Sequence, residues 1–130
     1  MRILVANDLQ GFKRLTNALR GQDIRFVQTL SEAKQVLETV KFDLIIAGVH
    51  FDDSRAVELL QEVRTSRKVC DTPLVFVRTR SSSLANEIKR TLANLQKVYH
   101  HNGLVETDAY QEDDLRIRAA LLSTLNTIQN

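Results

Sequence analysis

The chain has 130 residues, of which 43% are hydrophobic and 26% charged, enough for one compact core and typical of a globular protein. No apolar run is long enough to span a bilayer, and a net charge of +2 is too small to indicate nucleic-acid binding by itself. Cys70 is the only cysteine and cannot form an internal disulfide, so we expect a cytoplasmic protein. From the length we expect a single domain over residues 1–130.

Short runs rich in β-branched residues alternate with longer stretches in which apolar side chains recur every three or four positions. The short runs predict five strands, at residues 2–6, 24–29, 43–49, 74–77 and 103–107. The longer stretches predict a helix after each strand, with one apolar face. The side chains expected to pack inward are Leu9, Phe12, Leu15 and Leu19; Ala33, Val36, Leu37 and Val40; Val57, Leu60 and Val63; Leu84, Ile88, Leu92 and Leu95; and Leu115, Ala119, Leu122 and Leu125.

Polar residues and glycines between these segments indicate the helix ends. His100-His101 is expected at the solvated end of the fourth helix, where partial positive charge suits the helix dipole. The other expected boundaries are Gly21 at the end of the first helix, Ser31 as the cap of the second, Asp52-Asp53-Ser54 as the cap of a third helix over residues 54–67, Ser81-Ser82-Ser83 at the start of the fourth, and residues 112–128 for the last.

Five strand–helix units with short connections predict a parallel sheet covered by helices on both faces. For this length we expect a three-layer, doubly wound, flavodoxin-like α/β fold with strand order 2-1-3-4-5. In such a sheet, ligands bind beyond the carboxyl ends of the strands, near the point where strand order reverses. The residues expected to meet at that edge are Asn7, Asp8, Gly48, His50, Arg78 and Asp108.

Three strand segments carry a resemblance to a known family. Residues 3–8 read Ile-Leu-Val-Ala-Asn-Asp, residues 43–51 read Asp-Leu-Ile-Ile-Ala-Gly-Val-His-Phe, and residues 72–77 read Thr-Pro-Leu-Val-Phe-Val. These segments, and Val-Glu-Leu-Leu at residues 57–60, resemble the bacterial response-regulator receiver domains of the CheY-like family. The resemblance covers nearly the whole chain and implies the same fold and a place in two-component signalling or a phosphorelay.

In that family, two acidic residues after the first strand and an aspartate ending the third strand hold Mg²⁺, and this aspartate accepts a phosphoryl group. The acidic pair matches Asn7 and Asp8, so one carboxylate is replaced by an amide. The acceptor position matches Gly48, and His50 matches the residue whose backbone carbonyl usually ligates the metal. Asp8 alone makes a poor Mg²⁺ site, and no acyl phosphate can form at a glycine.

The family also contacts the phosphoryl oxygens through a Ser or Thr ending the fourth strand and a Lys ending the fifth. These positions match Arg78 and Asp108, with Thr79 as a neighbouring hydroxyl if the register shifts. We therefore expect a receiver-like protein without enzymatic activity that is not phosphorylated by the family's route. One hypothesis is that Arg78 reaches Asp8 and locks the domain in one conformation. The alternative is that Arg78 points to solvent.

The leading functional expectation is a protein-interaction or regulatory module in bacterial signal transduction, with a protein partner, no cofactor, and homodimer formation left open. A loosely basic stretch over the fourth strand and helix is an expected docking surface for an acidic protein segment, or more simply a solvated helix face. Its residues are Arg80, Lys89, Arg90 and Lys97.

Two other functions stay open. A small-molecule or ion sensor would use Asp8, His50 and Arg78 at the strand ends, although the spacing gives no complete metal-ligand set. An atypical receiver would instead accept phosphate on Asp8, Asp52 or Asp53. A nucleotide-binding site is not indicated, because no glycine-rich phosphate-binding motif follows the first strand.

Overall fold

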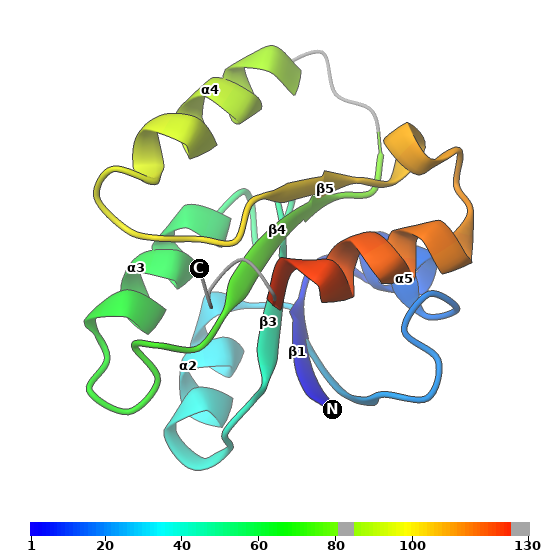
Figure 1. Ribbon diagram of the computed structural model, residues 1–130. Helices are drawn as coiled ribbons and strands as arrows, with labels where there is room; N and C mark the ends of the chain where they lie inside the picture. Colours follow the sequence, from blue (N-terminus) through cyan, green and yellow to red (C-terminus); the bar gives the residue numbers. More distant parts are fainter. Residues whose placement is uncertain (81–84, 126–130) are drawn as a thin grey trace.

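A computed structural model of the protein describes residues 1–80 and 85–125 (Figure 1). Five parallel strands form one sheet in the order β2-β1-β3-β4-β5, which confirms the predicted flavodoxin-like fold. The strands are β1 (Arg2–Ala6), β2 (Asp23–Val27), β3 (Leu44–Gly48), β4 (Leu74–Arg78) and β5 (Leu104–Glu106).

Helices cover both faces of this sheet (Figure 1). Helices α1 and α5 pack on one face, and α2, α3 and α4 pack on the other. None of the helices among the described residues has the length and apolar character needed to cross a membrane. The bounds are α1 (Leu9–Leu15), α2 (Leu30–Thr39), α3 (Ala56–Thr65), α4 (Ala85–Leu95), a short 3₁₀ helix η1 (Thr107–Tyr110) and α5 (Asp114–Ser123).

The alternation of side chains along the central strands divides the core into two layers. In β1, Ile3 and Val5 belong to the layer beneath α1 and α5, whereas Leu4 and Ala6 belong to the layer beneath α2 and α3. All residues of β3 are buried, as expected for a central parallel strand covered on both faces. The sheet is therefore a rigid platform from which the strand-end residues project.

Two of the expected helix boundaries are wrong. Thr29, rather than Ser31, caps α2 by accepting a hydrogen bond from the Glu32 backbone N–H at 3.1 Å. No side chain caps α3, and Asp52 instead accepts a hydrogen bond from the Leu30 backbone N–H at 2.8 Å, which supports the start of α2. The reason is that residues 52–54 all have a left-handed backbone, which turns the Asp52 carboxylate away from its own helix.

The first helix is shorter than expected, and Gly21 lies beyond its end. Regular α1 stops at Leu15, and turns carry the chain to Gly21, where φ of +91° suits a glycine. Phe12 packs against β2 by stacking on Phe26, but Leu9 is about half exposed rather than inward. The expected fourth-helix start at Ser81-Ser82-Ser83, with Leu84, lies outside the described residues.

The buried face of α5 also differs from the prediction. Ile117 and Leu121 are fully buried, whereas Leu115 is 78% exposed and Ala119 is exposed. The helix has apolar residues around most of its circumference, so periodicity alone does not define its inner face. The described helix ends at Ser123, and residues 126–128 of the expected helix lie outside the described part of the chain.

His101 is buried, with 4% exposed, which corrects its expected place at a solvated helix end. Its Nε2 atom lies 2.8 Å from the Leu92 carbonyl oxygen, and its Nδ1 atom accepts a hydrogen bond from the Gly103 N–H at 3.0 Å. These two contacts require the neutral ring with the proton on Nε2, because Nδ1 must be an acceptor. Through them His101 connects the end of α4 to β5.

We predict that Leu121→Ala lowers the free energy of unfolding by about 2–5 kcal/mol, because it leaves a cavity under α5. The matched change Leu115→Ala should alter it by no more than about 0.5 kcal/mol, because that side chain lies in solvent. Urea unfolding followed by circular dichroism measures both. Equal losses in the two variants would contradict the observed orientation of α5.

Stability should decrease as pH falls through the range below about 6.5, the ordinary histidine pKa. Burial lowers the pKa of His101 more than its hydrogen bond to Leu92 raises it, and nearby His100 and Arg64 lower it further. The unfolded state therefore binds the proton at a higher pH than the folded state, and acid favours unfolding.

Urea unfolding between about pH 8 and about pH 5 tests this dependence in wild type, His101→Gln and the exposed neighbour variant His100→Gln. We expect a smaller pH slope for His101→Gln only. An unchanged slope in that variant would show that His101 does not report the acid sensitivity.

Candidate functional site

The candidate site lies where the carboxyl ends of β1, β3, β4 and β5 meet. Asn7 and Asp8 follow β1, Gly48 ends β3, Arg78 ends β4 and Glu106 ends β5. The parallel register places these positions at the same edge, with Arg78 directly opposite Glu106 in the β4–β5 ladder. Topology thus assembles residues that are up to 99 positions apart, from Asn7 to Glu106.

The Asn7 side chain fills the space above the end of β3. Asn7 is 1% exposed, and a Cβ atom added to Gly48 would lie 2.1 Å from its Oδ1 atom. A Cβ atom on Gly11, in α1, would likewise lie 2.4 Å from its Nδ2 atom. The amide is therefore held between two glycines, and neither position has room for a side chain while Asn7 keeps this rotamer.

Both carboxylate oxygens of Asp8 have partners within the protein. Oδ1 accepts a hydrogen bond from the Gly11 N–H at 2.7 Å and caps α1, while Oδ2 pairs with Arg80 at 2.6 Å. Burial alone would raise the pKa of Asp8, but these hydrogen bonds and the charge of Arg80 outweigh it and leave the pKa below its usual value. Asp8 is thus an anion already neutralised by a guanidinium.

Arg78 does not reach Asp8, so the hypothesis of an Arg78–Asp8 lock is wrong, and Arg78 does not point to solvent either. It is 7% exposed and pairs with Glu106 at 3.0 Å. Neighbouring strands lie about 4.8 Å apart, so Glu106 is one spacing away, whereas Asp8 lies beyond β3 at about two spacings. Arg80, two residues past the strand end, makes the contact with Asp8 instead.

Glu106 also contacts α4. Its second carboxylate oxygen lies 3.5 Å from the Lys89 ammonium group. Asp108, which the resemblance placed at the end of the fifth strand, is exposed and belongs to η1. The strand ends two residues earlier, at Glu106, so the residue at this edge of the site is a glutamate.

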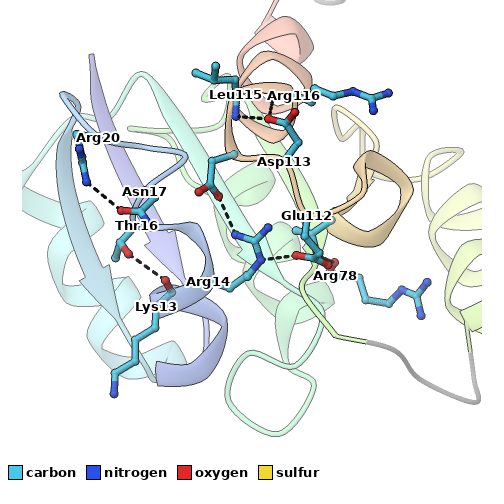
Figure 2. Close-up of polar contacts among 12 residues, drawn as sticks. Lys13, Arg14, Thr16, Asn17, Arg20, Arg78, Glu112, Asp113, Leu115 and Arg116 are labelled. Atoms are coloured by element: carbon cyan, nitrogen blue, oxygen red, sulfur yellow. Dashed lines mark hydrogen bonds and ion pairs between the residues drawn. The ribbon is translucent and has the colours of Figure 1, made fainter.

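A second polar cluster joins α1 to the start of α5, and Figure 2 shows Arg14 at its centre. Arg14 donates hydrogen bonds to Glu112 and, at 2.8 Å, to Asp114. Glu112 in turn accepts a hydrogen bond from the Thr107 hydroxyl at 3.0 Å. Because Thr107 directly follows β5, the cluster fixes the β5–α5 connection against α1.

His50 lies at the rim of a cavity of about 430 Å³ between α3 and α4. Burial lowers the pKa of His50, and the positive charge of Arg80 lowers it more than Asp8 raises it. The walls are mostly apolar, and Phe76 of β4 forms part of the lining. The ring is therefore neutral near pH 7 and does not supply charge to the strand-end residues.

The donor set does not fit the Mg²⁺ ion that the family resemblance implies. Mg²⁺ requires oxygen ligands in octahedral geometry, usually including carboxylates. Gly48 offers no side-chain oxygen, Asn7 Oδ1 already accepts a hydrogen bond from the Asp8 N–H at 2.9 Å, and Arg80 occupies one side of Asp8. Within residues 1–80 and 85–125, no group of three His, Cys, Asp or Glu side chains could hold a metal ion.

The four basic residues of the expected docking surface do not form one free patch. Arg80 pairs with Asp8, and Lys89 pairs with Glu106. Arg90 and Lys97 are exposed, and neither takes part in an ion pair within the described part of the chain. Half of the expected positive charge is therefore compensated by carboxylates of the strand-end site.

Solved structures of two response regulators and a sensor protein share this fold. A response regulator from Hahella chejuensis is 22% identical with a TM-score of 0.70, and the match covers 95% of this chain and 94% of that one. A sensor protein from Polaromonas sp. JS666 is 19% identical with a TM-score of 0.73, covering 97% and 96% of the two chains. A response regulator from Thermotoga maritima is 16% identical with a TM-score of 0.71, covering 96% and 97%. At these identities the similarity establishes the fold.

No protein-family model and no curated protein matches the sequence.

Glu106 was not among the residues expected at the site, and Arg80 was expected in the basic stretch over the fourth strand and helix. Glu106 could have been found by ending the fifth strand with the apolar pair Leu104-Val105, which puts the next residue opposite Arg78. No sequence signal points to the pairing of Arg80 with Asp8, because the two residues are 72 positions apart and Arg80 lies outside the strand.

We predict that Gly48→Ala destabilises the protein by about 1–3 kcal/mol, because its new methyl group overlaps the Asn7 amide. Asn7→Ala should recover part of this loss in the double variant, because it removes the overlapping atoms. A double-mutant cycle from urea unfolding measures the coupling. Additive losses would show that Asn7 does not occupy the space next to Gly48.

Proposed function

We propose that this protein is a non-phosphorylatable pseudo-receiver, a single cytoplasmic domain that acts as a protein-interaction module in bacterial two-component signalling. The observation that carries the proposal is that β3 ends at Gly48 and that the Asn7 amide fills the adjoining space. The family resemblance matches this position to the phosphoacceptor. The receiver fold of the structural neighbours supports the signalling setting.

The chemistry of phosphoryl transfer supports the first half of this proposal. Forming an acyl phosphate requires a carboxylate oxygen that attacks phosphorus while a leaving group departs, with a cation to neutralise the developing charge. Gly48 provides no side-chain oxygen, and the Asp8 carboxylate at the same edge has one oxygen bonded to the Gly11 N–H and the other paired with Arg80. The family's reaction therefore has neither its nucleophile nor its metal site.

Fixed ion pairs support the second half. Arg80–Asp8 and Arg78–Glu106 are ion pairs formed within the protein at the strand ends, the edge at which the family resemblance implies metal and phosphoryl contacts. Guanidinium groups keep their charge at all physiological pH values, so a change of pH in that range does not break these pairs by deprotonating the arginines. A domain held in one arrangement acts through the surface that it presents to a partner rather than by catalysis.

A small-molecule sensor is the second candidate function, and the cavity between α3 and α4 is the observation that favours it. Its volume of about 430 Å³ and mostly apolar lining suit a small ligand. A ligand bound there would raise the melting temperature in proportion to the logarithm of its free concentration. If the protein is an interaction module, its protein partner, rather than a small ligand, raises the melting temperature in this way.

The test of the main proposal is a two-dimensional ¹H–¹⁵N NMR titration with Mg²⁺, followed by Mg²⁺ with beryllofluoride. We expect no saturable shift at the amides of Asp8, Gly48 and Arg78, because the site lacks a carboxylate acceptor and its remaining carboxylate is paired. A phosphorylatable receiver titrated under the same conditions serves as the positive control.

Saturable shifts at those three amides would overturn the proposal and make the protein a working switch. Shifts confined to the loop of Asp52 and Asp53, with Mg²⁺-dependent phosphoryl incorporation from acetyl phosphate, would instead identify an atypical receiver.

A further inference from the structure

Leu115 is the most exposed large apolar side chain among the described residues, at 78%, and it lies at the start of α5. It borders a depression of about 420 Å³ between the turns that follow α1 and the first turns of α5, which we call the α1–α5 groove. Figure 2 shows Leu115 directed to the same side as Asn17 and Arg20, whereas Arg116 points away from them. The groove is lined by Asn17, Ala18, Arg20, Asp114, Leu115 and Arg118.

The groove has an excess of positive charge. Asp114 is compensated by Arg14 at 2.8 Å, and neighbouring Asp113 caps α5 by accepting hydrogen bonds from the backbone N–H groups of Leu115 and Arg116. Arg20 donates only to the Asn17 side chain, and Arg118 donates to the Arg20 carbonyl oxygen at 2.6 Å. Neither arginine is paired with a carboxylate within the described ranges.

The walls of the groove are fixed before any partner binds. The Arg118 contact ties α5 to the turns after α1, and Arg14 bridges α1 to the first turn of α5. Beneath the groove, Ala18, Ile117 and Leu121 belong to one buried layer. A preformed surface loses little conformational entropy on binding, which favours its use as a docking site.

The α1–α5 groove is better suited to docking a protein partner than the α4 surface expected from sequence, because it combines basic and apolar side chains. On that surface, Arg80 and Lys89 are already paired with carboxylates. In the groove, by contrast, an exposed leucine lies beside two arginines that have no carboxylate partner among the described residues. Docking surfaces typically combine arginine with an apolar centre and depend on complementary charge for specificity.

We propose that the α1–α5 groove docks an acidic, amphipathic segment of a protein partner, with an apolar side chain against Leu115 and carboxylates on Arg20 and Arg118. This inference rests on the proposed function as an interaction module and names the surface and partner chemistry that it uses. A second copy of the chain fits less well, because the groove would then oppose its own unpaired arginines.

The test uses a synthetic amphipathic helical peptide with leucines on one face and glutamates on both flanks, titrated into the ¹⁵N-labelled protein. A second peptide with lysines in place of the glutamates is its control. We expect saturable shifts with the acidic peptide only, confined to the residues after α1 and the first turns of α5. The affinity should fall as salt increases, because charge attraction is screened.

Two variants localise the contact. Leu115→Asp and Arg20→Glu should each weaken binding of the acidic peptide about tenfold, equivalent to about 1.4 kcal/mol. Both sites are exposed, and an added carboxylate near the start of α5 suits the helix dipole, so folding should be preserved. The matched controls Val98→Asp, at a side chain that is 72% exposed after α4, and Arg90→Glu should leave binding unchanged.

The inference is overturned by equal binding of the two peptides, by shifts that map to α4, by the absence of saturable shifts, or by concentration-dependent dimerisation that Leu115→Asp abolishes. These outcomes are independent of the Mg²⁺ and beryllofluoride titration. The groove can therefore fail as a docking site while the pseudo-receiver proposal stands, and the reverse also holds.

Discussion

The Asn7 amide, held between Gly48 and Gly11, is the constraint on which the rest of the strand-end site depends. Because β1 and β3 are neighbours, a side chain following one strand must share space with the residue that ends the other. Asn7 takes that space completely, and Gly48 accommodates it. Asp8, the next residue, is then oriented toward α1 and Arg80 instead of toward a metal ion.

The charges around this point are compensated in pairs that cross the whole edge of the sheet. Arg80 neutralises Asp8, while Glu106 connects Arg78 on β4 with Lys89 on α4. Removing one partner of a largely buried pair leaves an uncompensated charge, which is strongly destabilising. The site therefore favours a single arrangement, and this constancy is what the pseudo-receiver proposal requires.

Burial on one face of the sheet has a direct consequence at the surface. Packing Ile117 and Leu121 against the sheet turns Leu115 outward, next to the turns that follow α1. Arg14 pairs with the nearby carboxylates of Glu112 and Asp114. Among the described residues, Arg20 and Arg118 then have no acidic partner. The same helix orientation that completes the core thus creates a surface of apolar and basic character.

The pattern of apolar residues by itself determined the five strands and the parallel sheet, because strands buried on both faces and amphipathic helices have distinct periods. The strand order was expected from the chain length and the doubly wound fold class. The pattern also determined that Asn7, Gly48 and Arg78 follow or end their strands, and hence that they share one edge.

The partners at that edge were decided only by tertiary structure. Whether Arg78 meets Asp8 or Glu106 depends on the distance across β3, and whether Leu115 or Leu121 faces inward depends on the rotation of a helix with apolar residues around most of its surface. These are distances and angles between elements, and local sequence patterns do not encode them.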